Sequence, residues 1–450
     1  MTAIRVDERH YCAKLALGLA LLGALSMLYY QFGVFMPRVE SVRAAKHLQG
    51  EYSFGNDFYP VWLTTREWLR ERRDPYGPEL TRDIQMGLFG RPLDGQFSTD
   101  PPSDYRTYAY PAFTNLLLWP LSEAPFRTLR IVWAAFLAVL LAAAVLFWTR
   151  ALSWQVSESW LAVIILLTVS SYPELEGLYA GQLGLLVGFL LAASLLALVR
   201  GRLLAAGILL ALTTIKPQMT LLAIVYLLLW SAQDWSHRRR FSLAFIGTSF
   251  LLIAASLAVW PGWIESWSRV VAGYPRYSMP PLASELLGSV LGPHGGVGAI
   301  AILLIAALVV GWRGRAAPAG SHKFWLTLSL VLAITAVALL PGQSVCDHVI
   351  LLPGIFVLAC RRELHFLTRM SRALLAIGIA VLLWPYTAAF SLVVLRPLLN
   401  PELFASKAVF VLPLRTAAAF PFVVLGLLAT ARPAISGRGR ELVSASRTLE

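Results

Sequence analysis

Apolar stretches of about 20 residues recur along the whole chain and predict a bundle of membrane-spanning helices. Every backbone polar group inside a bilayer needs an internal partner, which an α-helix supplies. We therefore predict an all-α polytopic membrane protein with about twelve spans. These spans cover residues 12–34, 127–149, 158–172, 178–199, 203–214, 217–230, 241–260, 286–311, 323–340, 347–360, 373–393 and 408–431.

One long polar segment, residues 37–110, separates the first two predicted spans. Within it, "DFYPVWLTTREWLRERR" at 57–73 has the spacing of an amphipathic helix that lies along a membrane surface. The turn-forming residues of "DPYGPEL" at 74–80 end this helix. The stretch "YAYPAFTNLLLWPLS" at 108–122 is apolar but short for a span, so it predicts a second juxtamembrane element.

The composition agrees with a membrane protein, because 57% of the residues are hydrophobic and 14% are charged, with a mean hydropathy of +0.65. Soluble domains contain about 25% charged residues. The net charge of +13 does not indicate nucleic-acid binding, since Lys and Arg gather in alternate connections such as "HRRR" at 237–240 and "RRELHFLTRMSR" at 361–372. This positive-inside pattern predicts a cell-membrane protein with both termini cytoplasmic and residues 37–110 outside.

The predicted organisation follows from these spans and loops. A cytoplasmic N-terminus and first span are followed by an extracytoplasmic loop, a transmembrane core, further C-terminal spans and a cytoplasmic tail. Their ranges are 1–36, 37–126, 127–360, 361–431 and 432–450.

A carboxylate, Asp57, lies in "SFGNDFYPVW" shortly after the first span, among aromatic residues. Its position next to the membrane is consistent with a catalytic carboxylate that acts on a lipid-linked substrate. The alternative is structural, because "GND" before the predicted helix is also a good N-cap sequence.

A second feature is a break in the apolar stretch 203–230, which has basic residues at both ends. One helix cannot return to its starting side, so we predict two short helices that meet at Lys216 and Pro217. Proline suits the first turn of the second helix, and free N–H groups beside a cation would bind a phosphate. The alternative is a lysine that extends to the membrane surface and caps the turn.

Polar residues at other predicted outer turns add to this set. In "PGQSVCDHVILLPG" at 341–354, His348 would contact an anionic leaving group with Asp347 orienting it, or Asp347 and Ser344 would cap a helix. Gln182 begins an apolar span, where its amide needs a ligand or an interhelix hydrogen bond. Together these groups predict one extracytoplasmic site.

Nucleotide-binding, zinc-protease and serine-hydrolase motifs are absent from the sequence. The loop also lacks an Asp-x-Asp pair that would hold a metal and a nucleotide diphosphate, so we predict no cofactor and no metal ligand. A donor attached to a membrane lipid fits this chain better than a nucleotide sugar.

Five stretches follow one another along the chain: "GNDFYPVW", "DPY", "YAYPAFTNLLLWPLS", "GQLGLLVGFLLAASLLALVRGRLLAAGILLALTTIKPQMTLL" and "CDHVILLPG". In this order they resemble glycosyltransferase family 87, and the resemblance extends over about residues 15–360. This GT-C-type group includes polyprenol-phosphate-mannose-dependent α-mannosyltransferases. The resemblance implies about twelve membrane helices, a large first outer loop, and inverting sugar transfer from a polyprenyl-phosphate donor to a hydroxyl of a glycolipid or glycan. Mannose is the best-known sugar of the family, and arabinose, glucose or another hexose would suit the same residues.

The resemblance also implies roles for residues of this chain. Asp57 takes the position of the catalytic base, and Lys216 and His348 fall where basic residues meet the donor phosphate. We expect other polar and aromatic side chains to line the substrate path. These are Tyr59, Trp62, Tyr76, Tyr108, Gln182 and Asp347.

Three other classes of protein share some of these features. A transporter or flippase of a lipid-linked sugar would place polar groups at the membrane midplane, often within repeats, and no repeat is evident. A scaffold protein would tolerate Asp57→Asn. A membrane acyltransferase using His348 would need a cytoplasmic acyl-donor entry, for which no motif is found.

Overall fold

The computed structural model describes residues 2–360, 369–404 and 406–431, and these residues fold almost entirely into helices. One isolated antiparallel bridge joins Pro281 to Pro341. The predicted all-α class is therefore confirmed for the described residues. The predicted tail 432–450 and most of the basic connection 361–372 lie outside them.

Five of the described helices are long and apolar enough to cross a membrane, and a bent pair adds a sixth candidate. The first runs without a break from α1 through a π-helical stretch into α2. The bent pair consists of α7 and α8, which meet at 59°. The bounds are α1 Thr2–Tyr29, the π-helical Tyr30–Phe35, α2 Met36–Ala45, α6 Phe126–Ala151, α7 Glu158–Val169, α8 Tyr172–Ala180, α12 Trp235–Val259, α14 Leu282–Gly314 and α17 Arg369–Leu395.

Six shorter apolar helices of 10–17 residues fill the rest of the described bundle. They coincide with other predicted spans, but each is shorter than the 20 or so residues of a straight crossing. A count of twelve crossings therefore stays a prediction. Their bounds are α9 Leu183–Val199, α10 Leu203–Leu212 with the 3-10 turn Thr213–Ile215, α11 Leu221–Gln233 after the 3-10 turn Pro217–Met219, α15 His322–Ala338, α16 Leu352–Cys360 after the 3-10 helix Val345–Leu351, and α20 Phe420–Ala431.

Several predicted spans have different boundaries in the structure, and two of them are interrupted. The range 178–199 begins as the end of α8 and is interrupted at Gly181, whose φ of +70° ends that helix before α9 starts. The range 408–431 becomes a continuous helix only at Phe420. Before it lie three short elements: α18 Pro401–Phe404, α19 Lys407–Phe410 and the 3-10 turn Leu412–Leu414.

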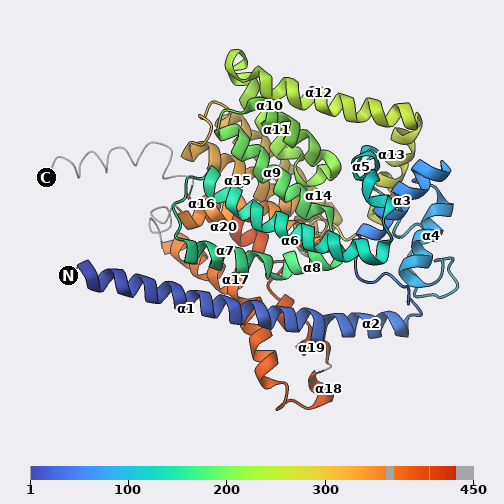
Figure 1. Cartoon of the computed structure of the whole chain (residues 1–450), viewed down its shortest axis with the longest axis horizontal. Coiled ribbons are helices and arrows are strands. Elements are labelled where there is room, and N and C mark those ends of the chain that lie inside the picture. Colours follow the sequence, from blue (N-terminus) through green and yellow to red (C-terminus); the bar gives the residue numbers. More distant parts are fainter. Residues whose placement is uncertain (1, 361–368, 405, 432–450) are drawn as a thin grey trace.

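The predicted outer loop folds into a cap of short helices at one end of the bundle, away from the N-terminus (Figure 1). The amphipathic helix predicted at 57–73 is present as α3, and the face that carries Val61, Thr64, Thr65 and Trp68 is buried. The break at 74–80 and the short helix within 108–122 are confirmed as well. The bounds are α3 Phe58–Glu71, α4 Pro78–Phe89, α5 Phe113–Leu118 and the 3-10 turn Trp119–Glu123. The connection after α12 adds α13 Trp263–Gly273 and the 3-10 turn Tyr274–Arg276 to this cap, where Trp267 bonds the backbone of Ala109.

Helices at the edges of the bundle expose apolar side chains. In α12, which runs along one edge in Figure 1, Leu243, Phe250 and Leu251 are 55%, 71% and 66% exposed. A continuous apolar surface of this kind is unfavourable in water but suits lipid. By contrast, α9 and α15 lie in the buried core, so the structure has the arrangement of a membrane bundle.

Candidate active site

Asp57 lies immediately before α3, where it could serve as a helix cap. Within the described residues, however, its side chain makes no capping hydrogen bond. One carboxylate oxygen accepts from the guanidinium of Arg106, and the other accepts from Nε2 of Gln182 at 2.7 Å. The backbone N–H of Asp57 donates to the carbonyl of Ala180 at 3.0 Å, which fixes the residue against the end of α8. Helix capping therefore does not explain the position of the Asp57 side chain.

Gln182 joins the carboxylate to the interior of the bundle. Its Oε1 accepts from the hydroxyl of Tyr110 at 3.0 Å and from Nζ of Lys216 at 3.1 Å. The interhelix bonds expected for this amide are thus present. The preceding Gly181 is required because its φ is +70° and a Cβ there would lie 2.8 Å from Cβ of Phe58.

Lys216 lies at the predicted helix break, with Pro217 in the first turn that follows. Its ammonium donates to Oδ1 of Asp347 at 2.7 Å, and the two side chains are 8% and 0% exposed. Lys216 points into the protein, so it does not extend to the membrane surface. Because an ammonium has three donors and two are used, one N–H remains for a further acceptor such as a phosphate oxygen.

A close approach of backbone to side chain allows this ion pair. A Cβ at Gly184, in the first turn of α9, would lie 2.2 Å from Oδ1 of Asp347. Removal of one partner from a buried ion pair costs about 3–5 kcal/mol, since the other charge is left buried alone. Gly184 therefore helps to hold Asp347 within reach of Lys216.

Charges alternate along the resulting chain of contacts. The order is Arg106, Asp57, the neutral amide of Gln182, Lys216 and Asp347. The two cations and two carboxylates balance, so the cluster is neutral as a whole. We call these five residues the polar cluster; it can bind a proton donor at its carboxylates and an anion at its cations.

Arg106 was not predicted from the sequence. It is an isolated arginine in the tyrosine-rich "DYRTYAY", and it occupies the left-handed region at φ +70°. This conformation costs an ordinary residue about 1–3 kcal/mol and is concentrated at functional sites. Burial lowers the pKa of the Arg106 guanidinium, but Asp57 and the neighbouring tyrosines Tyr105 and Tyr274 together raise it by more, so Arg106 stays charged.

Tyr110, also missed, completes the outer side of the cluster. Burial raises the pKa of its hydroxyl, which therefore remains protonated and donates to Gln182. In the sequence, the only indication of a role for Tyr110 is its place in "YAYPAF", within the predicted juxtamembrane element at 108–122.

His348 follows Asp347 and is 4% exposed. Its Nδ1 and Oδ2 of Asp347 are buried without a hydrogen-bond partner in the described part of the chain. Asp347 instead bonds Lys216, so the orienting contact expected between Asp347 and His348 is not made. Across residues 2–360, no hydrogen bond or ion pair connects His348 to Asp57 or Lys216, and its role at a donor phosphate stays a prediction.

The four aromatic candidates fall into two groups. Tyr76 donates its hydroxyl to the carbonyl of Tyr110 at 2.9 Å, and the ring of Tyr108 lies 5.8 Å from that of Tyr110. These two therefore lie beside the polar cluster. Tyr59 and Trp62 instead stack on each other, and both contact the ring of Phe126 at the start of α6, Tyr59 edge-on and Trp62 at a tilt.

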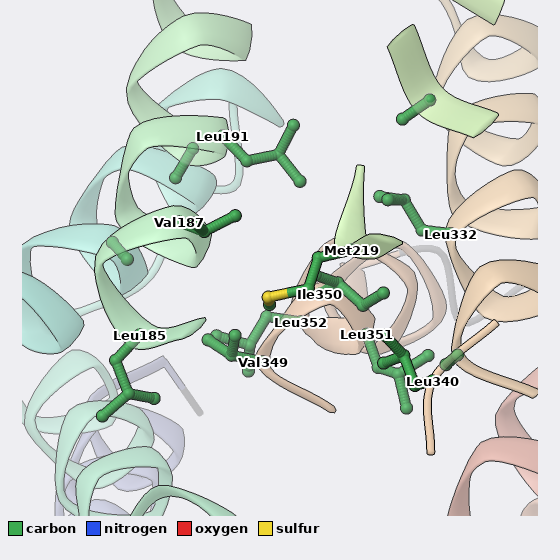
Figure 2. Close-up of a cluster of buried hydrophobic side chains, with 14 of the residues drawn as sticks. Leu185, Val187, Leu191, Met219, Leu332, Leu340, Val349, Ile350, Leu351 and Leu352 are labelled. Atoms are coloured by element: carbon green, nitrogen blue, oxygen red, sulfur yellow. The ribbon is translucent and has the colours of Figure 1, made fainter. Parts of the chain in front are cut away.

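Buried apolar side chains, among them Leu185, Met219 and Val349, gather in one part of the bundle (Figure 2). Each of these residues lies two or three positions after a member of the polar cluster in the sequence: Leu185 follows Gln182, Met219 follows Lys216 and Val349 follows Asp347. Because these side chains are buried, they help to keep water from the ion pair. Low polarity strengthens electrostatic interactions within the cluster.

The family model described as Glycosyltransferase family 87 matches residues 108–341. This range contains Tyr110, Gln182 and Lys216, whereas Asp57 and Asp347 lie outside it and reach the cluster through the fold. No curated protein and no solved structure matches the chain.

Proposed function

The chain belongs to glycosyltransferase family 87, and we propose that it transfers a sugar from a polyprenyl-phosphate donor to a hydroxyl of a glycolipid or cell-envelope glycan, with inversion. The family model covers 108–341 of 450 residues, just over half of the chain. The protein is thus a glycosyltransferase with several candidate membrane helices. Its donor, sugar, acceptor and residue roles belong to the proposal.

One observation carries the proposed mechanism: Asp57 is connected to the buried Lys216 by a single amide, that of Gln182. The three residues come from the cap, the turn before α9 and the break after α10. A base and a cation held this close can act on the two ends of one displacement. The acceptor hydroxyl would meet Asp57 while the donor phosphate would meet Lys216.

In the proposed step, Asp57 takes the proton of the acceptor hydroxyl as its oxygen bonds to the sugar C1 carbon. The bond from C1 to the phosphate oxygen breaks, and the polyprenyl phosphate leaves as an anion. A carboxylate has about four lone-pair sites, so its two present hydrogen bonds leave room for the hydroxyl. Because the leaving group is already a stable anion, a second carboxylic acid, as used by most glycosidases, is not needed.

The cations would stabilise the charge that develops on the phosphate. Lys216 has one free N–H, and its position among apolar side chains makes that interaction stronger than it would be in water. Asp347 would keep Lys216 in place, and His348, with its unpartnered Nδ1, would be a second contact for the phosphate. Arg106 would hold the Asp57 carboxylate toward the acceptor.

The membrane setting supports a lipid-linked donor. A GT-C-type arrangement of about twelve helices, with both termini cytoplasmic and the cap outside, would place Asp57 at the outer membrane surface. The donor lipid would lie among the helices with its phosphate near Lys216. Mannose is our proposed sugar, because it is the one best known in the family that the chain resembles.

The test is sugar transfer in membranes that contain the full chain. Radiolabelled polyprenyl-phosphate mannose and a lipid extract are incubated with wild type, Asp57→Asn and the control Asp94→Asn, which alters an exposed aspartate of the same cap. We expect Asp57→Asn to lose about 10²–10⁴-fold in rate, the contribution of a general base, and Asp94→Asn to match wild type.

The other outcomes are equally clear. Equal rates in all three proteins would remove Asp57 as the base. Movement of labelled lipid across the membrane without product would favour a flippase. If no protein forms product, the same comparison with polyprenyl-phosphate arabinose tests a different sugar.

A further inference from the structure

A pocket of about 300 Å³ lies in the cap beside the polar cluster. This volume is at the lower end of the range for small-ligand pockets, about 300–1,000 Å³. Its walls are the turn between α3 and α4, the segment 103–107, and α13 with the 3-10 turn after it. The lining residues on which the argument depends are Asp74, Tyr76, Asp104, Thr107, Arg269 and Tyr277.

Residues that do not line the pocket make hydrogen bonds that hold its walls in place. Trp267 donates its indole N–H to the carbonyl of Ala109 at 2.9 Å, which ties α13 to the segment after Arg106. Gln85 donates to the carbonyls of Ser103 and Tyr105, both at 2.9 Å. The pocket is therefore held open by its own scaffold, so a ligand would not have to order it.

The lining combines groups that suit a sugar. Asp74 and Asp104 offer acceptors, Arg269 offers donors, and Tyr76 and Tyr277 present aromatic rings. Two carboxylates balance the two arginines of the lining, Arg269 and Arg276, so the pocket has no net charge for an anion. A neutral ligand with many hydroxyls fits this mixture, whereas a lipid chain or a phosphate does not.

Part of the hydrogen-bonding capacity is already used, and the rest is available. Asp104 pairs with Arg276, and one oxygen of Asp74 accepts from the backbone N–H of Tyr76 at 2.9 Å. Arg269 is exposed and makes a single hydrogen bond within the described residues, to Oγ of Ser266 at 3.1 Å. Most of its five N–H donors are free to bind a ligand.

The pocket shares a wall with the polar cluster. Thr107, which lines the pocket, directly follows Arg106, whose guanidinium bonds Asp57. Tyr76 lines the pocket and bonds the backbone of Tyr110, whose hydroxyl in turn bonds Gln182. The pocket and the carboxylate of Asp57 are therefore neighbouring features of the cap.

We propose that this pocket binds a sugar unit of the acceptor glycan, adjacent to the unit whose hydroxyl meets Asp57. The inference rests on the proposed sugar transfer and extends it, because it makes the acceptor a glycan of at least two units.

The first test measures binding separately from transfer. Soluble trisaccharides of mannose, glucose and arabinose are presented to the purified full-length chain, and saturation-transfer NMR gives the Kd. The Asp57→Asn protein is used beside wild type, so that binding is measured without turnover. Arg269→Ala and Tyr277→Ala remove lining groups, and Arg82→Ala is the control because Arg82 is exposed on α4 and does not line the pocket.

We expect at least one trisaccharide to bind both wild type and Asp57→Asn, and to bind Arg269→Ala and Tyr277→Ala at least tenfold more weakly. Loss of a hydrogen bond to a charged group costs about 1.5–3 kcal/mol, which corresponds to roughly 10–100-fold in Kd. Arg82→Ala should bind like wild type. Thermal unfolding identifies any variant that fails to fold, and Arg269→Gln and Tyr277→Phe then serve as milder replacements.

Equal Kd values in lining and control variants would overturn the inference, as would the absence of binding by all three trisaccharides. In the transfer assay, the lining variants should raise KM for the acceptor and leave KM for the donor unchanged. Trisaccharide binding that depends on Arg269, in a protein that transfers no sugar, would support the pocket and count against the proposed function alone.

Discussion

Gly184→Ala tests whether the buried ion pair between Lys216 and Asp347 depends on the close approach of α9. The added Cβ would lie 2.2 Å from Oδ1 of Asp347, and ordinary contact begins at 3.4 Å. The carboxylate must therefore move by about 1.2 Å, the difference between these two distances. A bond that is 2.7 Å long and lengthens by this amount would be outside the hydrogen-bonding range.

The expected loss of stability follows from the burial of the pair. Removal of one partner from a buried ion pair costs about 3–5 kcal/mol, which is an upper limit for a displacement that separates the two charges. Alanine in a helix is favoured over glycine by about 1 kcal/mol, which opposes the loss. We therefore expect Gly184→Ala to be less stable than wild type, by at most about 2–4 kcal/mol.

The assay is thermal unfolding of the purified protein in detergent, with Gly247→Ala as the matched control. Gly247 lies in α12, where an added Cβ would meet none of the described atoms within 4 Å. The control should unfold at or above the wild-type Tm, while Gly184→Ala should unfold well below it. A Gly184→Ala protein as stable as the control would refute the reasoning, because the carboxylate would then have moved without cost.

Three further changes probe the same cluster and the cap. Lys216→Met should lower the Tm strongly. The double variant Lys216→Met with Asp347→Leu should recover the Tm without restoring transfer, since an apolar pair can replace a buried ion pair. A double variant that remains unstable would contradict this. Gln182→Leu removes three hydrogen bonds and should abolish transfer while the protein stays folded, and near-normal activity would argue against a linked base and cation. Arg91, through its hydrogen bond, lowers the pKa of Asp100, so the stability from this pair is complete above about pH 4 and is lost as the pH falls through the lowered pKa. Cleavage of the loop around Asp100 by pepsin, divided at each pH by the cleavage of an unfolded peptide substrate, should accordingly rise as the pH falls, and Arg91→Gln should remove the pH dependence of this ratio.

Much of the fold followed from local patterns. The helix break at Lys216 could be predicted because basic residues flank both ends of the apolar stretch 203–230, and a single helix cannot return to the side of the membrane on which it starts. The surface helix α3 could be predicted from its amphipathic spacing. Asp57, Gln182 and Lys216 stood out because polar side chains in apolar surroundings need partners. Helix bends were harder, as at the 59° angle between α7 and α8, because packing decides them.

The sequence by itself determined that this chain is a helical membrane protein and which polar residues are costly to bury. Only the tertiary structure decided their partners. Lys216 pairs with Asp347 across 131 residues of sequence, and Arg106 reaches Asp57 from a left-handed turn. No local pattern specifies such contacts, because hydropathy fixes which residues enter the bundle but leaves many pairings open. Close packing at Gly181 and Gly184 selects the one in which every charge of the cluster has an opposite partner.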